Sequence, residues 1–402
     1  MAKVVLQVSK DFDIDVGGGT HYAPFGNAFF NGNTLESESQ ITARTAGLLT
    51  DLYVRIITNN RAASSVTLRK NGANGNLTVS IGASTTGVFQ DNVNKDYISS
   101  GDLLDYIVTE GAGGTTFRLS IIQTVFDATG GTSIRWVSNS AASTTGNGTT
   151  LYTFIGGDHG FNASENFGKI NINVTGTWKN LHVNIGANAR TTTTTFRSRK
   201  NLANGNQVVS VGAGLTGIFE DLVNTDSVSA NDDLAYARIM GASAENLTTR
   251  SIATDFLTAD NTFGTNNSFA GASAINFGST IYWAVGGSPF DASITEADYQ
   301  SIMGVGGKVS NLAVNISANT LNAGTSIVTL RKNGANGNNT VSIGFGTTGQ
   351  FEDSSNVDFF SYSDLICHQI VTSGTAGTLS FRSIGITVLV NMPNRTLVGI
   401  GI

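Results

Sequence analysis

The sequence predicts an all-β protein made of three tandem antiparallel β-sandwich domains. Three observations support this fold class. The chain of 402 residues repeats itself with a period close to 130 residues. Apolar residues alternate with polar ones in short runs, and clusters of Gly, Asn and Asp separate these runs. Short alternating runs bounded by turn residues are typical of sandwiches and barrels.

The repeat is clearest in an Arg-Lys-Asn unit. Residues 66–76 read VTLRKNGANGN, and residues 328–338 read the same eleven letters. The middle copy has diverged, but its Arg199 lies 130 residues after Arg69 and 132 residues before Arg331. A fixed period of this length indicates that a whole domain was duplicated.

The period predicts three superposable domains, over residues 1–127, 128–257 and 258–402. One matching strand position should be buried in every copy, and its residues are Val54, Val183 and Val314. The segments 127–149 and 257–279 are rich in Gly, Ser, Thr and Asn, and we expect each to belong to the domain that follows it. The strand candidate at residues 4–8 would take the same place in the first copy.

Turn chemistry places the hairpins within each copy. An Asn-Gly pair supplies the positive φ angles of a tight hairpin turn, so the strand that ends in Arg-Lys should turn back at Asn71-Gly72. Helical periodicity is nearly absent. The one helix that the pattern predicts covers residues 292–303, where Ile294, Tyr299, Ile302 and Met303 could share a face.

The order of these features resembles the C1q/TNF-type jelly rolls in all three copies. A strand, a Lys-Asn-Gly turn and a second strand are followed by Phe89-Gln90-Asp91 and later by Gly101-Asp102-Leu103 in the first copy. The resemblance implies jelly-roll domains packed around a threefold axis, here as a pseudo-trimer within one chain. The Gly-, Asn- and Thr-rich texture is similar to virion proteins of tailed bacteriophages, of the capsid-decoration and fibre types.

The composition argues against several classes of function. Only 13% of the residues are charged and the net charge is -6, without a basic block, so no nucleic-acid partner is expected. No apolar stretch reaches the length of a membrane span, and the N-terminal apolar run is too short for a signal peptide. We therefore expect synthesis in the host cytoplasm and no membrane partner. The single cysteine, Cys367, precludes intrachain disulfides.

One recurring loop is a candidate calcium site. After each recurring Phe, the pattern Asp-x-x-Asn-x-Asp brings two carboxylates and an amide within six residues, and calcium prefers such oxygen ligands. The alternative is that Asp and Asn cap turns through the local backbone. The nine residues are Asp91, Asn94, Asp96, Asp221, Asn224, Asp226, Asp353, Asn356 and Asp358.

Catalytic and cofactor signals are weak, and we expect neither an enzyme nor a cofactor. The G-x-G-x-x-G patterns at 212–217 and 344–349 lack the helix that a dinucleotide site requires, so turns explain them. The four histidines occupy unrelated positions of the repeat, and Cys367 and His368 should point to opposite faces of a strand. The residues that recur are turn formers and core apolar residues.

These observations predict a structural virion protein, most simply a capsid decoration or cement protein that binds the major capsid protein or another virion protein. The alternative is a head- or tail-fibre protein that recognises a cell-surface glycan. The alternative predicts exposed aromatic residues gathered at one end, for which Trp136, Trp178 and Trp283 are the candidates. In the first hypothesis, residues 1–15 and 392–402 lie outside the repeat and would provide the anchor.

Overall fold

A computed structural model of the whole chain confirms the all-β fold class. The structure describes residues 2–13, 19–25, 34–128, 133–139, 143–144, 146–153, 155, 161–172, 174–258, 262–285, 293–304 and 306–390. Six antiparallel sheets form three sandwiches of two sheets each, and no described sheet takes strands from two domains. No helix in this part of the chain is long and apolar enough to cross a membrane.

Domain 1 contains strands β1 to β10. The order of its first sheet is β1 (Ala2–Asp13), β10 (Phe117–Ala128), β4 (Gly47–Asn59), β7 (Gly87–Asp91), and β8 (Asp96–Ile98) also pairs with β4. The order of its second sheet is β2 (Thr20–Pro24), β9 (Leu103–Thr109), β5 (Ser64–Lys70), β6 (Ala73–Ile81), and β3 (Ile41–Thr42) also pairs with β9. A short 3₁₀ turn, η1, spans Glu36–Glu38.

Domain 2 repeats this strand order. Its first sheet runs β11 (Ser133–Asn139), β20 (Leu247–Thr258), β15 (Gly176–Asn188), β18 (Gly217–Val228), with β12 (Ser143–Thr144) on β20. Its second sheet runs β13 (Thr150–Thr153), β19 (Asp232–Met240), β16 (Thr194–Lys200), β17 (Ala203–Val211), with β14 (Ile170–Ile172) on β19. A single helical turn, α1 (Glu165–Gly168), takes the place of η1.

Domain 3 has the same order again. Its first sheet runs β21 (Thr262–Asn276), β29 (Thr378–Val390), β24 (Gly307–Asn319), β27 (Gly349–Phe360). Its second sheet runs β22 (Thr280–Ala284), β28 (Leu365–Val371), β25 (Thr325–Lys332), β26 (Ala335–Gly344), with β23 (Ser301–Ile302) on β28. The predicted helix over 292–303 is wrong. Only η2 (Glu296–Tyr299) is helical, as one 3₁₀ turn, because β23 follows at once and Ile294 points to solvent.

Each domain starts with an edge strand, taken from the N-terminal segment in domain 1 and from the segment between copies in domains 2 and 3, as predicted. β1, β11 and β21 pair with β10, β20 and β29, the last strand of their own domain. Strands β10 and β20 end one residue beyond the predicted boundaries at 127 and 257. Residues 2–13 of the proposed N-terminal anchor therefore lie in the sheet of domain 1, while 392–402 lie outside the described residues.

The cores follow the alternation of the sequence. Val54, Val183 and Val314 are buried between the two sheets of their domains, as the repeat predicted. The hairpin between β5 and β6 turns at Asn71 and Gly72, with φ of 52° and 78°. In domain 2 the same turn contains Asn201 and Leu202, and Leu202 has φ of 64°. A non-glycine, branched side chain is strained there.

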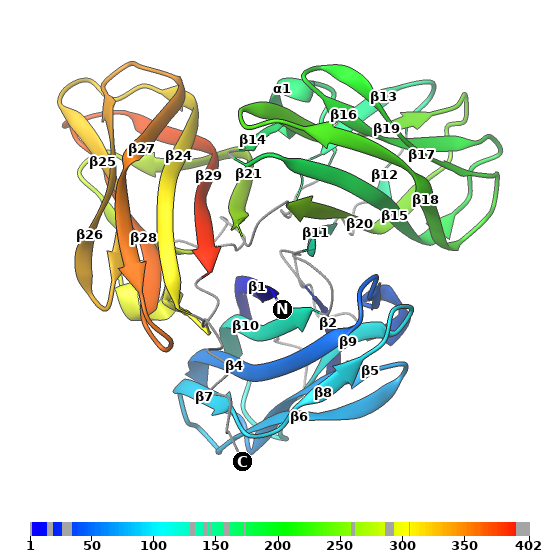
Figure 1. Cartoon of the computed structure of the whole chain (residues 1–402), viewed down its shortest axis with the longest axis horizontal. Coiled ribbons are helices and arrows are strands. Elements are labelled where there is room, and N and C mark those ends of the chain that lie inside the picture. Colours follow the sequence, from blue (N-terminus) through cyan, green and yellow to red (C-terminus); the bar gives the residue numbers. More distant parts are fainter. Residues whose placement is uncertain are drawn as a thin grey trace, which may run out of the picture.

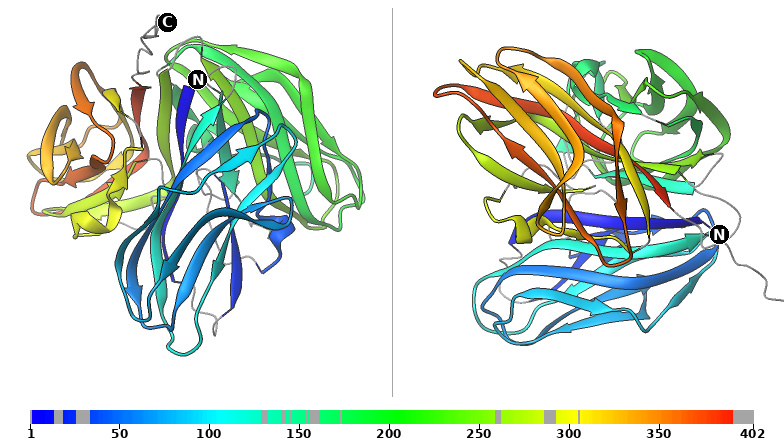
Figure 2. Two further views of the ribbon diagram at one scale, coloured as in Figure 1. Left: turned by 60° about the horizontal axis from the view of Figure 1, so that its bottom comes forward. Right: turned by 60° about the vertical axis from the view of Figure 1, so that its left-hand side comes forward.

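The three domains form a closed ring. Figure 1 shows them as three lobes around a centre, with β1, β10, β11, β20, β21 and β29 on the inner side of the lobes. Figure 2 shows from two further directions that the lobes lie side by side and not in a row. This is the pseudo-trimer that the resemblance implied, and contacts between the domains, described below, close it.

Candidate functional site

The recurring arginine of each copy forms a bidentate ion pair with a glutamate of a short helical segment, and this pair is called the clamp below. Nε and Nη2 of Arg69 donate to the two carboxylate oxygens of Glu36 in η1, both at 2.9 Å. Nη1 donates to Oδ1 of Asn74 at 2.6 Å, and Nη2 also reaches the carbonyl of Gly72. The bidentate pair fixes the short segment η1 on the outer face of the second sheet, because such forks constrain both position and orientation.

The clamp is kept in all three domains. Arg199 binds Glu165 of α1 at 2.9 and 2.6 Å, and Arg331 binds Glu296 of η2 at 3.2 and 2.8 Å. The hydrogen bonds to Glu raise the pKa of each arginine above its ordinary value, more than burial lowers it. The sequence singled out these arginines only as markers of the repeat, since their partners lie 33 to 35 residues away.

The segments held by the clamps dock onto the next domain. Between domains 1 and 2, Glu38 of η1 pairs with Arg250 on β20, and Nδ2 of Asn184 donates to the carbonyl of Ser37 at 3.1 Å. Arg44 pairs with Glu220 on β18, and this carboxylate also lies 2.8 Å from Nδ1 of His182. This interface is therefore mainly ionic.

The interface between domains 3 and 1 has different chemistry. The side chains of Tyr299 and Ile302, from η2 and β23, pack in one buried cluster with Tyr53 and Ile121 of domain 1. In the polar contacts there, domain 3 contributes uncharged backbone carbonyls. Nε2 of Gln123 donates to the carbonyl of Ile302 at 2.6 Å, and the Tyr53 hydroxyl donates to the carbonyl of Gln300 at 3.3 Å.

The third interface joins domains 2 and 3. The turn α1 and strand β14 contact β21, and buried apolar residues of both domains form one continuous cluster. Burial lowers the pKa of Arg382 on β29, and Asp233 of domain 2 partly offsets this shift. Each clamped segment thus lies against the first sheet of the following domain. The segment of domain 1 contacts domain 2, that of domain 2 contacts domain 3, and that of domain 3 contacts domain 1, which closes the ring.

The candidate calcium residues form caps of turns. The carboxylate of Asp91 accepts hydrogen bonds from the backbone N–H of Thr78, Val93 and Asn94 and from Nδ2 of Asn94, at 3.0 to 3.2 Å. Burial raises its pKa, but these bonds outweigh burial and hold it below the usual value. Asp96 accepts from the backbone N–H of Asn76 and Leu77.

The other two copies are arranged in the same way. Asp221 and Asp353 cap their own turns with Asn224 and Asn356, and Asp226 and Asp358 accept from the strands β17 and β26. In this arrangement N–H donors occupy the oxygens that calcium would need. The described residues contain no group of three or more His, Cys, Asp or Glu that could hold a metal ion.

The remaining sequence candidates lie in the interior or in turns. Trp178 and Trp283 are 0% and 1% exposed, and Trp178 donates to Oγ1 of Thr254 at 2.6 Å. The side chain of Trp136 lies outside the described residues. Burial lowers the pKa of His368 to about 3, so its imidazole is neutral. The two G-x-G-x-x-G segments join β17 to β18 and β26 to β27 as turns.

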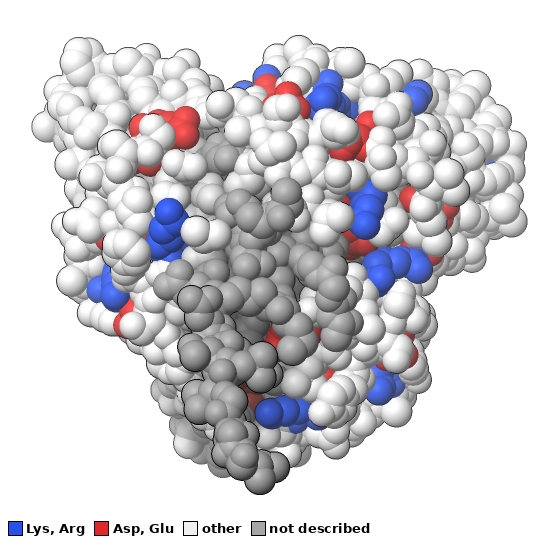
Figure 3. Space-filling view, viewed as in Figure 1, with Lys and Arg blue, Asp and Glu red and all other residues white. Residues whose placement is uncertain are grey.

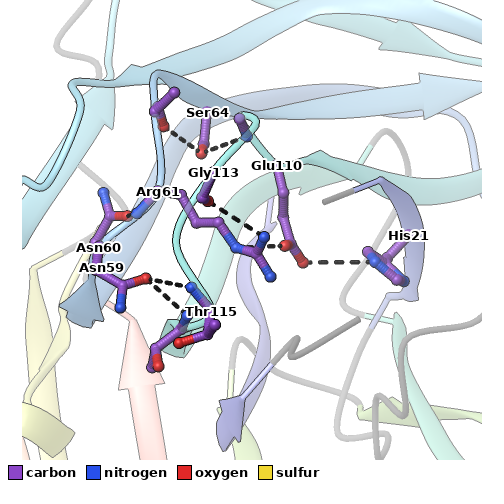
Figure 4. A network of polar contacts seen from close by, with 11 residues as sticks. His21, Asn59, Asn60, Arg61, Ser64, Glu110, Gly113 and Thr115 are labelled. Atoms are coloured by element: carbon purple, nitrogen blue, oxygen red, sulfur yellow. Dashed lines mark hydrogen bonds and ion pairs between the residues drawn. The ribbon is translucent and has the colours of Figure 1, made fainter. Parts of the chain in front are cut away.

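A buried polar triad of Arg61, Glu110 and His21 lies at one end of the domain 1 sandwich (Figure 4). The carboxylate of Glu110 lies 3.2 Å from Nε of Arg61 and 3.4 Å from Nε2 of His21, and Nη1 of Arg61 donates to the carbonyl of Gly113. All three side chains are less than 7% exposed. The sequence did not reveal this triad because its members come from three separate strands and loops.

The face of the molecule in Figure 3 carries little charge. On the face in Figure 3, basic and acidic side chains form small separate groups of both signs on all three lobes, and most of the described surface has neither. The sequence matches no protein-family model and none of the curated proteins.

Proposed function

We propose that this protein is a structural component of a virus particle that acts as a capsid decoration or cement protein. The closed ring of three clamped domains carries the proposal. A body with pseudo-threefold symmetry can engage three subunits around a local threefold point of an icosahedral shell at once, and multivalent engagement multiplies weak contacts. Its partner in this proposal is the major capsid protein, and it acts by binding without turnover.

Apolar contact, rather than charge, suits the attachment. The turns capped by Asp91 and Asp221 present Val93 and Val223 at their tips, where the side chains are 78% and 87% exposed. Leu222 beside Val223 is 54% exposed. Exposed apolar side chains on rigid turns are suited to a protein interface, whose buried centre is depleted in charge. The third copy has Ser355 at this position, so the ring offers two apolar tips and one polar tip.

The glycan-binding alternative receives less support. Two of the three tryptophans that it needed at the surface are core residues. We further propose that the domains are jelly rolls and that the protein is similar to phage virion proteins. The sheet orders β1-β10-β4-β7 and β2-β9-β5-β6, which interleave along the chain, support a jelly roll.

The test is occupancy on particles. We expect purified virions to contain the protein and stripped heads to bind it again. The double substitution V93D and V223D should lower rebinding at least tenfold without lowering Tm, whereas Ser355→Asp should leave rebinding unchanged. If purified particles lack the protein, or if the double variant rebinds like the wild type, the proposal is wrong. Deletion of residues 393–402 tests the C-terminal anchor in the same assay.

A further inference from the structure

Domain 2 contains two buried arginines without an acidic partner in the described part of the chain. Arg190, between β15 and β16, is 1% exposed, and Arg238 on β19 is 0% exposed. Three guanidinium nitrogens, Nε of Arg190 and Nε and Nη2 of Arg238, are buried and have no hydrogen-bond partner there. Buried charges are ordinarily paired, because an unpaired charge in the interior is strongly unfavourable.

The other contacts of these arginines are to neutral groups. Arg190 donates through Nη1 to the carbonyls of Gly146 and Glu245, both at 3.0 Å, and through Nη2 to that of Gly241 at 2.6 Å. Arg238 donates through Nη1 to Oγ1 of Thr249 at 3.3 Å, and its guanidinium lies 3.7 Å from the ring centre of Phe161. Carbonyls and a ring face orient a cation without neutralising it.

Both arginines are cations at neutral pH. Burial, together with the nearby charge of Arg190, lowers the pKa of Arg238 only to about 9. Burial also lowers the pKa of Arg190 from its high ordinary value. Two like charges therefore lie near each other in the interior of one sandwich.

The matching positions of domain 1 include a carboxylate that pairs with the arginine. Backbone hydrogen bonds identify the matching positions. The N–H groups of Arg61 and Arg190 donate to Oδ1 of Asn59 and Asn188, two residues earlier. The N–H groups of Glu110 and Met240 donate to the carbonyls of Gly19 and Thr149, each the residue before the first strand of the second sheet. In domain 1 the carboxylate of Glu110 neutralises Arg61 (Figure 4). In domain 2 the matching residue is Met240, so Arg190 has lost this internal carboxylate.

The second basic residue lies on opposite members of the strand pair in the two domains. His21 pairs with Val108 in domain 1, and the matching pair in domain 2 is Leu151 with Arg238. Domain 3 has Leu321, Thr372 and Ile370 at the matching positions and no charge at all. Among the copies, domain 2 alone has two buried arginines at this place and lacks the carboxylate.

We infer that domain 2 binds a small inorganic anion of halide size at the unpartnered guanidinium nitrogens of Arg190 and Arg238, beside the buried Met240 that matches Glu110 of domain 1. The hydroxyl of Thr194, which is buried and has no partner in the described residues, is on the strand that pairs with β19 and can donate as well. Thr191 and Thr193, which follow Arg190 in the chain, are exposed.

The first test is direct. Crystals soaked in bromide should show an anomalous peak in contact with the guanidinium groups of both arginines. In solution, Tm should be higher in sodium chloride than in sodium gluconate at equal ionic strength, because an anion that binds only the folded state stabilises it. A missing peak, or equal Tm in both salts, would overturn the inference.

Variants sharpen the result. Met240→Glu restores the carboxylate of domain 1, and Arg238→Ile introduces the residue of domain 3, so both should fold and lose the chloride dependence. Thr372→Glu is the control, because it places a glutamate at the matching position of domain 3, where no arginine is present. This variant should keep the dependence of Tm on chloride. If Met240→Glu responds to chloride as the wild type does, the assignment is wrong.

One acidic residue needs its own control. Asp158 lies three residues before Phe161 in the sequence and outside the described residues. If Asp158 is the counterion, the wild type will be insensitive to chloride and Asp158→Asn will become sensitive, which contradicts the inference. If an anion is bound, wild type and Asp158→Asn will show the same chloride dependence.

Discussion

Arg250 on the first sheet of domain 2 pairs with Glu38 on the clamped segment of domain 1. The position of Arg250 is taken by Ser120 in domain 1 and by Arg382 in domain 3. Ser120 is buried in the domain that receives η2, where the neighbours are tyrosine and isoleucine. One position of the repeat has therefore adapted to different neighbours in the three domains.

The ionic interface should respond to charge reversal. Glu38→Arg or Arg250→Glu alone should lower the free energy of unfolding by about 1 to 2 kcal/mol, because each places like charges in a partly buried contact. The double variant should recover most of this loss. Denaturant unfolding of the four proteins at low salt measures the coupling, and a double variant as unstable as the sum of the single ones would disprove the pairing.

The clamps should contribute equally in the three copies. Arg69→Met, Arg199→Met and Arg331→Met each remove a bidentate ion pair and leave a glutamate partly buried, at a cost of about 2 kcal/mol. Lysine should not restore the stability, since it lacks the planar fork. Denaturant unfolding measures the loss of stability. Limited proteolysis of the native variants shows whether the segment that carries the glutamate is loosened. Wild-type stability in Arg331→Lys would show that the fork is unnecessary.

The strained turn of domain 2 provides a stabilising substitution. Leu202 has φ of 64°, whereas the matching Gly72 and Gly334 have 78° and 80°. Leu202→Gly should raise the free energy of unfolding by about 0.5 to 1 kcal/mol, because relief of the left-handed strain exceeds the entropy added to the unfolded chain. The reverse change, Gly334→Leu, should destabilise by a similar amount. Calorimetry on both variants compares them with the wild type.

Asp105 should make stability fall as the pH rises. Its carboxyl is fully buried beneath the clamp, and burial, followed by the charge of Glu36 and opposed by Arg69, raises its pKa to about 8. Between about pH 4, the unfolded value, and pH 8, the folded state binds the additional proton, so stability declines across this window and is flat above it. The groups that act on it are the side chains of Glu36 and Arg69.

The control for this prediction is built into the repeat. Ala235 and Cys367 occupy the position of Asp105, so an uncharged residue is compatible with the clamp. Asp105→Asn and Asp105→Ala should therefore raise Tm more at pH 8 than at pH 5. An equal change of Tm at both pH values would mean that Asp105 does not titrate in this range.

The capped turns should not depend on calcium. Asp91→Ala removes four hydrogen bonds to a buried carboxylate and should cost about 1 to 3 kcal/mol. Calcium or a chelator should leave the wild-type Tm unchanged, because N–H donors occupy the carboxylate oxygens. A rise of Tm with calcium that Asp91→Ala abolishes would instead establish the metal site.

Much of the fold was predictable because it depends on local chemistry. Alternation placed Val54, Val183 and Val314 in the cores, and the Asn-Gly pairs placed the hairpins. The predicted helix failed because apolar residues at 292–303 also suit a turn followed by a short strand that packs on domain 1. For the candidate site, the sequence identified Arg69 as a recurring residue and Asp91 with Asn94 as members of one turn. It did not identify Glu36 or Thr78, which bind Arg69 and Asp91 from 33 and 13 residues away.

The sequence by itself determined the repeat, the all-β class and the positions that each core requires, because period and alternation are properties of neighbouring residues. Only the tertiary structure decided which chemistry each copy has at a matching place. Glu110 neutralises Arg61 in domain 1, whereas Met240 leaves Arg190 beside Arg238 in domain 2. These groups meet across two sheets and a turn, and the energy of a buried charge depends on what surrounds it in space, not along the chain.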